Sequence, residues 1–543
     1  MSITVERRPR DWRGWGALDV LCIGLAALLL APVLGYPFGR DQSVFAYVAR
    51  EWTSGALPYR DVFDHKPPGV YAVYALGRVL GGAGAWPVRV LEIAALLGTG
   101  WLIALAVARD RQPRAGERGA AALLCAGCYA TTFDWAASGQ PEVWEGMLLV
   151  ASFVVSRRAH TLRRAALGSG ALLGAALLFK HPAALVGGVT LSSLIARFWE
   201  GPSRGARLRE GARACALHLF AACAVLACAA FYFVVRGGAA EAYDACVGYL
   251  LQYPRTYRCM SGVANVLVTE FWLHRARLWA VLGGLGLASA GISAWRRGSR
   301  RELAGTAWSG ALFAAAVLSV VVQRRYLQYH WVIVTPFVVL GIAEALGALG
   351  RIREWATPVA AVAAVAAGVA TGPKWHVNNA VDFRSATVAF WEYSAGVRDR
   401  PRYLGSFVWK GYSYPSEERV AAAIRARAQP GDGLVVRGHS PNIYLGAGLK
   451  SPSRFIYDMP LWGDAPTYKR DAWRREHELA TFAPPVRFVV AQATASAEHA
   501  AMRARGYETL VADGDFVVFE FPRQMPVHLT DARLPQARGP MVP

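Results

Sequence analysis

The sequence predicts a mainly α-helical membrane protein that crosses the bilayer many times and carries a small α/β domain near its C-terminus. Of the 543 residues, 54% are hydrophobic and 18% are charged, whereas soluble proteins of this length carry more charge. Many apolar runs approach the roughly 20 residues needed to cross a bilayer. After Gly372 the chain becomes more polar and contains no run of that length.

The apolar runs predict about eleven transmembrane helices. We expect them near residues 17–35, 86–108, 119–133, 141–156, 165–179, 182–199, 212–235, 276–294, 303–322, 327–348 and 356–372. No small-residue cleavage site follows the first run, so we interpret it as a retained span rather than a signal peptide. Residues 69–82 are apolar but short, and we expect a surface or re-entrant helix there.

Arginine placement predicts the orientation of these spans. Clusters lie near residues 7–13, 109–118, 157–164, 204–213, 296–301 and 351–353. If 69–82 does not cross the bilayer, all these clusters fall on one side, which the positive-inside rule makes cytoplasmic. A net charge of +21 is also typical of nucleic-acid-binding proteins. Because the arginines lie between apolar runs, we interpret them as topogenic and expect no nucleic-acid partner.

Three regions follow from this pattern. Residues 1–372 form the transmembrane domain, with a first outer loop at 36–82 and a cytoplasmic N-terminus. Residues 373–523 alternate predicted helices and strands, which indicates a small extracytoplasmic α/β domain. The predicted elements are helices at 417–427, 468–481 and 497–505 and strands at 434–437, 486–491, 508–511 and 516–521. The tail 524–543 is rich in Pro and Arg, and we expect it to be disordered.

The first outer loop carries the densest chemistry. It reads GRDQSVFAYVAREWTSGALPYRDVFDHKPPGV from Gly39 to Val70. Its first half has helical spacing, and its prolines then interrupt a long helix. Asp41 follows the first span, where an outward carboxylate could act as a general base. The alternative is that Asp41 caps the helix N-terminus, a position that favours Asp.

Lysines and arginines recur at span ends on the same predicted face. Lys66, held by two prolines, suits a phosphate headgroup because its ammonium is a compact charge with three donors. Nonspecific contact with lipid headgroups is the alternative. The predicted donor-binding residues are Tyr59, Arg60, Lys66, Lys180, His181, Arg324, Arg325 and Tyr326. Glu142 and Asp64 are candidate acceptor-side or second carboxylates, and Asp134 lies on the same face.

These groups together indicate transfer from a phosphate-linked donor. Cations at one membrane face can hold a lipid phosphate and stabilise a leaving group, while a carboxylate activates the nucleophile. Nucleotide sugars are not supplied outside the cytoplasm, so a sugar donor there would be lipid-linked. The alternative is a lipid-linked saccharide transporter or flippase, which would place charges through a central channel. A glycan-binding protein whose C-terminal domain acts is a further alternative.

The first loop resembles that of the membrane-embedded GT-C glycosyltransferases. The matching residues are R-D-Q-x-V-F-A-Y at 40–47 and G-x-x-P-Y-R-D-x-x-D-H-K-P-P-G at 55–69. G-Q-P-E at 139–142, F-K-H-P at 179–182 and R-R-Y at 324–326 follow in the family's order. The resemblance spans residues 15–350 and is to the bacterial branch that includes lipid A aminoarabinose transferase and protein O-mannosyltransferases.

The resemblance implies a polyprenyl-phosphate-linked sugar donor, an inverting reaction and a bacterial inner (plasma) membrane location. By the resemblance, Asp41 matches the catalytic carboxylate, Lys66 and Lys180 match lysines near the donor phosphate, and Arg325 and Tyr326 line the same cavity. Many members place a second acid after the first, where this chain has Gln42. We therefore assign no metal ligands and no certain cofactor, and a divalent cation stays open. The expected partners are the donor, membrane lipids and a lipid, glycan or protein acceptor.

Overall fold

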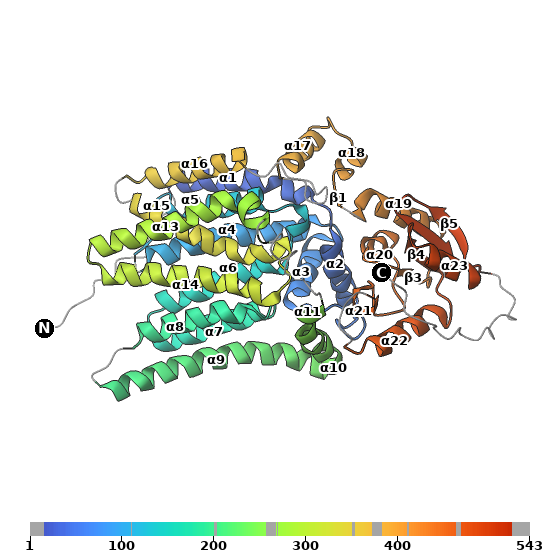
Figure 1. Ribbon diagram of the computed structural model, residues 1–543, viewed down its shortest axis with the longest axis horizontal. Helices are drawn as coiled ribbons and strands as arrows, with labels where there is room; N and C mark the ends of the chain where they lie inside the picture. The colour runs from blue at the N-terminus through green and yellow to red at the C-terminus, as the bar shows by residue number, and fades with distance from the viewer. Residues whose placement is uncertain are drawn as a thin grey trace.

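The computed structural model describes residues 16–109, 111–199, 203–256, 268, 270–349, 353–371, 383–409, 412–462 and 468–523. Figure 1 shows an elongated molecule in which a bundle of long helices meets a smaller α/β part at one end. We call that smaller part, residues 383–523, the C-terminal region. The end of the bundle that meets it is the near end, and the opposite end is the far end. The predicted disordered tail lies outside the described residues.

Every range predicted to span the membrane falls on a helix of the bundle. These are α1 (Ala17–Leu30) with η1 (Ala31–Gly35), α4 (Trp86–Ala108), α5 (Glu117–Thr132), α6 (Pro141–Arg158), α7 (Leu162–Leu177), α8 (Ala183–Arg197), α9 (Arg204–Val235), α13 (Arg277–Arg296), α14 (Arg300–Gln323), η5 (Gln328–Val334) with α15 (Thr335–Leu349), and α16 (Ala356–Thr371). Six of the helical segments in the described ranges are long and apolar enough to cross a membrane. The chain is thus a multi-pass membrane protein, and the number of eleven crossings stays a prediction.

Small residues let the helices of the bundle approach one another closely. A Cβ atom on Gly170 of α7 would lie 2.1 Å from the backbone oxygen of His218 on α9. One on Gly286 of α13 would lie 2.3 Å from the backbone oxygen of Gly341 on α15. Membrane helices associate through such close packing because lipid gives them little hydrophobic drive to pair.

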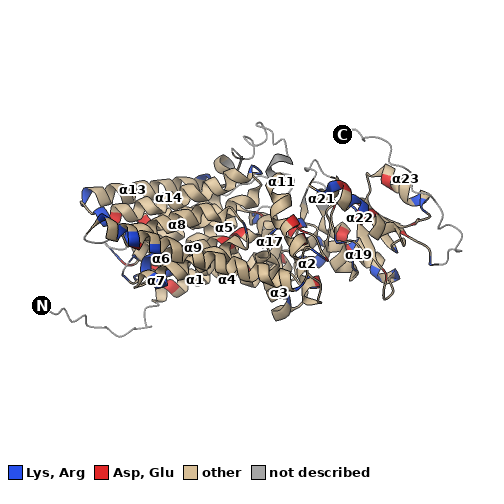
Figure 2. Ribbon diagram, turned by 90° about the horizontal axis from the view of Figure 1, so that it is seen from below, with Lys and Arg blue, Asp and Glu red and all other residues tan. Residues whose placement is uncertain are grey.

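Among the described residues, the arginine clusters gather at the far end of the bundle (Figure 2), and the cluster at 7–13 lies outside those residues. Several of them bind backbone carbonyls at helix ends. Arg158 Nη1 donates to Leu105 O at 3.2 Å and Arg111 O at 3.0 Å, and Arg197 Nη1 donates to Ser156 O at 2.7 Å. Helix C-termini offer unpaired carbonyls, so these arginines satisfy them. The predicted orientation requires this grouping at one end of the bundle. That the far end faces the cytoplasm stays a prediction.

Two short helices at the near end come from the first loop. α2 (Arg40–Thr53) occupies the stretch predicted as an amphipathic helix, and it buries Val44, Tyr47 and Val48 on one face. α3 (Gly69–Gly81) has 13 residues, too few for the roughly 20 that a crossing needs. The helix predicted at 69–82 is therefore present and short, as expected.

The C-terminal region is a small α/β structure in which the predicted helices and strands are all present. Its helices are α17 (Phe383–Ser394), α18 (Arg400–Leu404), α19 (Tyr414–Arg427), α20 (Asn442–Ala447), α21 (Met459–Trp462), α22 (Arg470–Phe482) and α23 (Ser496–Ala504). Its strands are β1 (Val408–Trp409), β2 (Tyr412–Ser413), β3 (Leu434–Val436), β4 (Phe488–Gln492), β5 (Glu508–Ala512) and β6 (Phe516–Glu520). The main sheet has the order β3-β4-β6-β5, with β3 parallel to β4 and the other pairs antiparallel.

Hydrogen bonds dock the C-terminal region on the first loop. Phe63 N donates to Arg454 O at 2.8 Å, and Arg50 Nη2 donates to Leu449 O at 2.8 Å. Asn442 Nδ2 donates to Phe38 O at 2.8 Å. These bonds join residues nearly 400 positions apart, so the first loop and the C-terminal region form one structure at the near end.

A buried ion pair in α4 anchors the loop between α5 and α6. Arg89 and Glu92 are both fully buried, with 3.3 Å between Nη1 and Oε2. Glu92 Oε1 accepts from Tyr129 Oη at 2.5 Å and from Gly139 N at 2.8 Å. Arg89 Nη2 donates to Pro37 O at 3.1 Å. The pair therefore ties the α5–α6 loop to the start of the first outer loop.

Removing one member of this pair should destabilise the fold strongly. Glu92→Ala leaves a buried guanidinium without its partner, which costs about 3–5 kcal/mol of unfolding free energy. We expect a large fall in the thermal midpoint of the purified protein in detergent. Glu302→Ala is the matched control, because that glutamate pairs with the 45%-exposed side chain of Arg297. Such exposed pairs contribute about 1 kcal/mol or less, so equal effects of the two changes would contradict this assignment.

Candidate active site

Asp41 lies in the first turn of α2 at the near end. The helix is capped by Gly39 and no side chain makes a capping hydrogen bond, so the N-cap alternative for Asp41 is wrong. Its Oδ2 lies 3.9 Å from Lys66 Nζ and accepts from Gln140 Nε2 at 3.3 Å. Its Oδ1 lies 4.0 Å from His439 Nε2. Asp41 is thus surrounded by groups from three separate parts of the chain.

The charges of Asp41 and Lys66 stabilise each other. Burial alone would raise the pKa of Asp41, but Lys66 and then His439 outweigh it and hold that pKa below its usual range. Burial alone would lower the pKa of Lys66, but Asp41 and Asp64 outweigh it and raise that pKa. Both groups therefore stay ionised at neutral pH.

Aromatic and backbone contacts fix Lys66. Its Nζ lies 4.7 Å from the centre of the Phe45 ring, and its backbone oxygen accepts from Tyr59 Oη at 2.8 Å. Tyr59 is itself fully buried, and its hydroxyl binds the backbone of Lys66 rather than the ammonium group. Gly69 N donates to Leu178 O at 2.7 Å, and a Cβ on Gly69 would lie 2.6 Å from that oxygen. This close approach brings the Lys66 loop beside the turn that carries Lys180.

A second acid–base pair lies beside the first. Lys180 Nζ donates to buried Glu142 Oε1 and to Gln323 Oε1, the latter at 3.3 Å. Lys180 Nζ is also 5.6 Å from the ring centre of Tyr329, a half-buried tyrosine that lies near both Asp41 and Glu142. Tyr329 therefore lies close to both pairs, a neighbour that the sequence analysis did not identify.

Arg325 turns inward in the short connection between α14 and η5. Its guanidinium carbon lies 3.7 Å from the ring centre of Tyr253, and that ring lies 4.9 Å from the ring of His65. The flanking residues Arg324 and Tyr326 have φ values of 53° and 48°, in the left-handed region that side chains disfavour. This irregular backbone directs Arg325 inward and leaves Arg324 exposed. Tyr326 is half-buried against the core.

Two further predicted donor residues lie at the surface. Arg60 Nη2 pairs with Asp61 Oδ2 at 2.8 Å on the exposed side of the first loop, and Arg60 Nη1 donates to Arg236 O at 3.0 Å. His181 is exposed beside Lys180. Asp134, on the same face, pairs with Arg275 at 3.4 Å. The structure does not bring Arg60 into contact with Asp41 or Lys66.

Asp64 is buried, and its carboxylate contacts three side chains of the protein. Its carboxylate accepts from Tyr71 Oη and Tyr457 Oη, each at 2.7 Å, and lies 3.1 Å from His65 Nδ1. These contacts and the charge of Lys66 outweigh the effect of burial, so the pKa of Asp64 is lowered. The carboxylate is held by donors from α3, the first loop and the C-terminal region.

Gln42 stands where the family resemblance led us to expect a second acid, and it has a role that the sequence analysis did not predict. Its Nε2 donates to Ala136 O at 2.8 Å and to Ser138 O at 2.6 Å. Both partners are acceptors, so the position needs a donor, which an ionised carboxylate cannot supply. Gln42 thus holds the loop that presents Gln140 to Asp41. Among the described residues, no group of three or more His, Cys, Asp or Glu could hold a metal ion.

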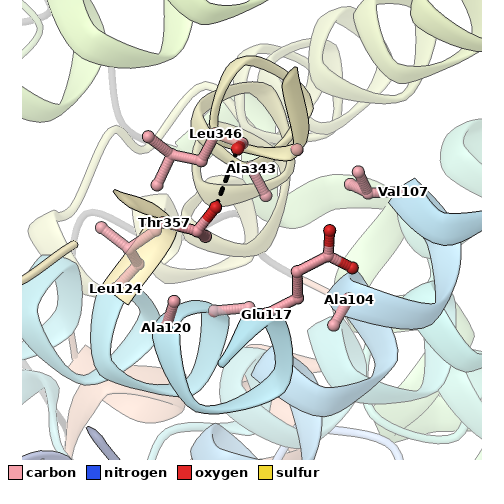
Figure 3. A pocket seen from close by; sticks show the side chains of 10 residues that line it. Ala104, Val107, Glu117, Ala120, Leu124, Ala343, Leu346 and Thr357 are labelled. Carbon is pink, nitrogen blue, oxygen red and sulfur yellow. Dashed lines mark hydrogen bonds between the residues drawn. The ribbon is translucent and has the colours of Figure 1, made fainter. Parts of the chain in front are cut away.

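A hollow at the far end is separate from this cluster. Figure 3 shows mostly apolar side chains around it, together with Glu117 and Thr357. Thr357 Oγ1 donates to Leu346 O at 2.9 Å, and Glu117 pairs with Arg111 at 2.7 Å. These polar groups are satisfied within the bundle.

Gln42→Glu should destabilise the packing of the α5–α6 loop at the near end. The ionised carboxylate would face two carbonyl oxygens, so the α5–α6 loop should loosen and the thermal midpoint should fall. Unsatisfied buried polar groups cost about 1–3 kcal/mol each. The control is Gln112→Glu at an exposed position, which should leave the midpoint unchanged. A Gln42→Glu protein as stable as the wild type would show that the two carbonyls do not depend on Gln42.

Comparisons with known proteins agree with this architecture. Residues 65–233 match a family model described as dolichyl-phosphate-mannose-protein mannosyltransferase. The fold is similar to that of ArnT from Cupriavidus metallidurans in the apo state, with a TM-score of 0.59 and 18% identity over 92% of this chain and 97% of that one. ArnT bound to undecaprenyl phosphate aligns over the same shares with a TM-score of 0.57 and 19% identity. None of the curated proteins compared matches the chain.

The matched segment contains Lys66, Glu142 and Lys180, and the fold similarity extends over both the bundle and the C-terminal region. The resemblance expected from the first-loop motifs is therefore confirmed at the level of the fold. The protein has the GT-C fold of the membrane glycosyltransferases and is similar to the bacterial ArnT branch.

Proposed function

We propose that this protein transfers a sugar from a polyprenyl-phosphate-linked donor to an acceptor outside the cytoplasm. The observation that carries the proposal is the pairing of Asp41 with Lys66 at 3.9 Å, next to the Lys180–Glu142 pair. An ionised carboxylate among fixed cations suits a reaction in which a nucleophile loses a proton while a phosphate leaves. A family model named for dolichyl-phosphate-mannose and a fold neighbour bound to undecaprenyl phosphate support a polyprenyl phosphate donor.

In this mechanism Asp41 acts as the general base. The acceptor oxygen attacks the anomeric carbon of the sugar, and Asp41 accepts the proton as the new bond forms. Attack opposite the leaving phosphate would invert the anomeric centre. Because Lys66 keeps Asp41 ionised, the base is available at neutral pH without a prior deprotonation step.

The cations stabilise the departing phosphate. Lys66 and Arg325 would contact the phosphate oxygens of the leaving polyprenyl phosphate, and Lys180 would supply further positive charge. Preorganised positive charge lowers the barrier because it requires little rearrangement as the leaving-group charge develops. Phe45 and Tyr253 hold two of these cations in place in the resting protein.

The transporter alternative is less well supported. A transporter would be expected to place charged residues along a path through the bundle. Here Asp41, Lys66, Lys180 and Arg325 group at the near end, while the far-end arginines bind carbonyls and glutamates. We propose that the near end faces the outside of the inner membrane and that the C-terminal region is extracytoplasmic.

Asp41→Asn should abolish transfer while leaving the protein folded. The amide cannot accept the proton, so kcat should fall by about 100-fold or more, a common contribution of general-base catalysis. The assay supplies undecaprenyl-phosphate sugars to the purified protein and follows the released lipid phosphate. Lys66→Ala should instead weaken undecaprenyl phosphate binding. Transfer by Asp41→Asn at the wild-type rate would overturn the assignment of the base.

The pH dependence of transfer should report the lowered pKa of Asp41. Because the base is lost only as pH falls through that lowered pKa, kcat/KM should stay level between about pH 5 and 8. Lys66→Met removes the charge that lowers the pKa of Asp41, so the acid limb should move to higher pH. An acid limb at the same pH in both proteins would show that another group controls it.

A further inference from the structure

A turn in the C-terminal region reaches the candidate base. It follows β3 and runs from Gly438 to Pro441. Gly438 N donates to Asp458 Oδ2 at 2.7 Å, and Asp458 N donates to Gly438 O at 3.0 Å. Gly438 has a φ of 104°, which L side chains rarely adopt, and a Cβ there would lie 3.1 Å from Gln492 Nε2. The turn therefore has one well-defined shape.

The turn presents His439 to Asp41. The imidazole stacks on the Tyr457 ring with 4.9 Å between centres and 19° between planes. Tyr457 donates to Asp64 at 2.7 Å, so the surface on which His439 rests is bonded to the first loop. The ring of His439 is thus fixed by both the C-terminal region and the membrane part.

The buried Nε2 atom of His439 makes no hydrogen bond within the described part of the chain. It lies 4.0 Å from Asp41 Oδ1, which is too far for a direct hydrogen bond. Buried polar atoms without a partner are uncommon and usually indicate a missing ligand or water. Two atoms at this separation can each lie about 2.8 Å from one oxygen placed between them, a normal hydrogen-bond length.

We propose that this gap is the acceptor subsite and that His439 binds the nucleophilic hydroxyl group of the acceptor. The inference rests on the proposed function and assigns the acceptor end of the same site. The hydroxyl oxygen accepts from His439 Nε2–H and donates its proton to Asp41 Oδ1. As its bond to the anomeric carbon forms, the carbon–phosphate oxygen bond breaks, polyprenyl phosphate leaves with the electron pair, and the proton passes to Asp41.

The charge around the gap favours a neutral hydroxyl over a phosphate acceptor. Burial lowers the pKa of His439 to about 4, even though Asp41 acts to raise it. The imidazole is therefore uncharged at neutral pH and supplies one N–H donor. A phosphate in the gap would face the Asp41 carboxylate with no charge from His439 to offset the repulsion. A hydroxyl both donates and accepts, as the two facing atoms require.

The experiment measures the KM for the acceptor and the Kd for the donor-site lipid separately in His439→Ala and His439→Gln. Octyl glucoside serves as the hydroxyl acceptor, octyl phosphate as the phosphate acceptor, and undecaprenyl phosphate as the donor-site probe. We expect His439→Ala to raise the KM for octyl glucoside about tenfold, the usual effect of losing one hydrogen bond. The Kd for undecaprenyl phosphate should change less than twofold. His439→Gln keeps an N–H donor and should recover part of the loss.

Lys450→Ala is the matched control for docking. Lys450 Nζ pairs with Glu51 Oε2 at 2.9 Å across the same interface, its side chain is 65% exposed, and it has no contact with Asp41. This variant should keep the wild-type KM for octyl glucoside. If Lys450→Ala raised this KM as much as His439→Ala does, the effect of His439→Ala would reflect weaker docking of the C-terminal region. That result would overturn the inference.

Two other results separate this inference from the proposed function. An unchanged KM in His439→Ala, together with lost transfer in Asp41→Asn, overturns the acceptor subsite and leaves the proposed function standing. Preference of the wild type for octyl phosphate over octyl glucoside overturns the hydroxyl assignment. Wild-type transfer by Asp41→Asn overturns both.

Discussion

The carboxylate of Asp64 is the contact on which the near end depends. It is 2% exposed and accepts hydrogen bonds from Tyr71 on α3 and from Tyr457 in the C-terminal region. A buried carboxylate that loses its donors is strongly destabilising, so these two parts of the chain must stay together around the first loop. The consequences reach both sides of the candidate site, because Lys66 lies two residues along the chain and His439 stacks on Tyr457. Asp64 thus helps to position two neighbours of Asp41, Lys66 and His439.

The two ends of the bundle use charge differently. At the far end, arginines bind carbonyl oxygens at helix termini or pair with glutamates such as Glu344, 2.9 Å from Arg109. These pairs hold helices together. At the near end, Lys66 and Arg325 lie against the rings of Phe45 and Tyr253, and Lys66 also pairs with Asp41 at 3.9 Å. In the proposed mechanism these cations bind the leaving phosphate, whereas the far-end arginines have a structural role.

The sequence predicted the bundle well because apolar length is a local property, and the helices of the C-terminal region followed from local patterns too. It also brought Asp41, Lys66, Glu142 and Lys180 together, because a single topological rule places their loops on one face. The residue pattern alone did not separate Arg325 from Arg324, although the family resemblance singled out Arg325, because the left-handed backbone at Arg324 is what turns one inward and leaves the other exposed. The sequence also could not predict that His439 lies beside Asp41. It lies nearly 400 residues from Asp41, and a Gly-His-Ser-Pro turn by itself indicates only a loop. Gln42 was noted as a departure from the family, but its bonds to Ala136 and Ser138 depend on tertiary contacts.

The docking of the C-terminal region has a consequence for how such proteins can diversify. Asn442, Tyr457 and Arg454 contact backbone or side chains of the first loop, so the two surfaces are matched residue by residue. A chimera that takes this region from one relative and the helices from another would inherit mismatched halves of a single interface. If the gap between His439 and Asp41 is the acceptor subsite, as proposed, new acceptor preferences should arise through paired changes on both surfaces rather than through exchange of the whole C-terminal region.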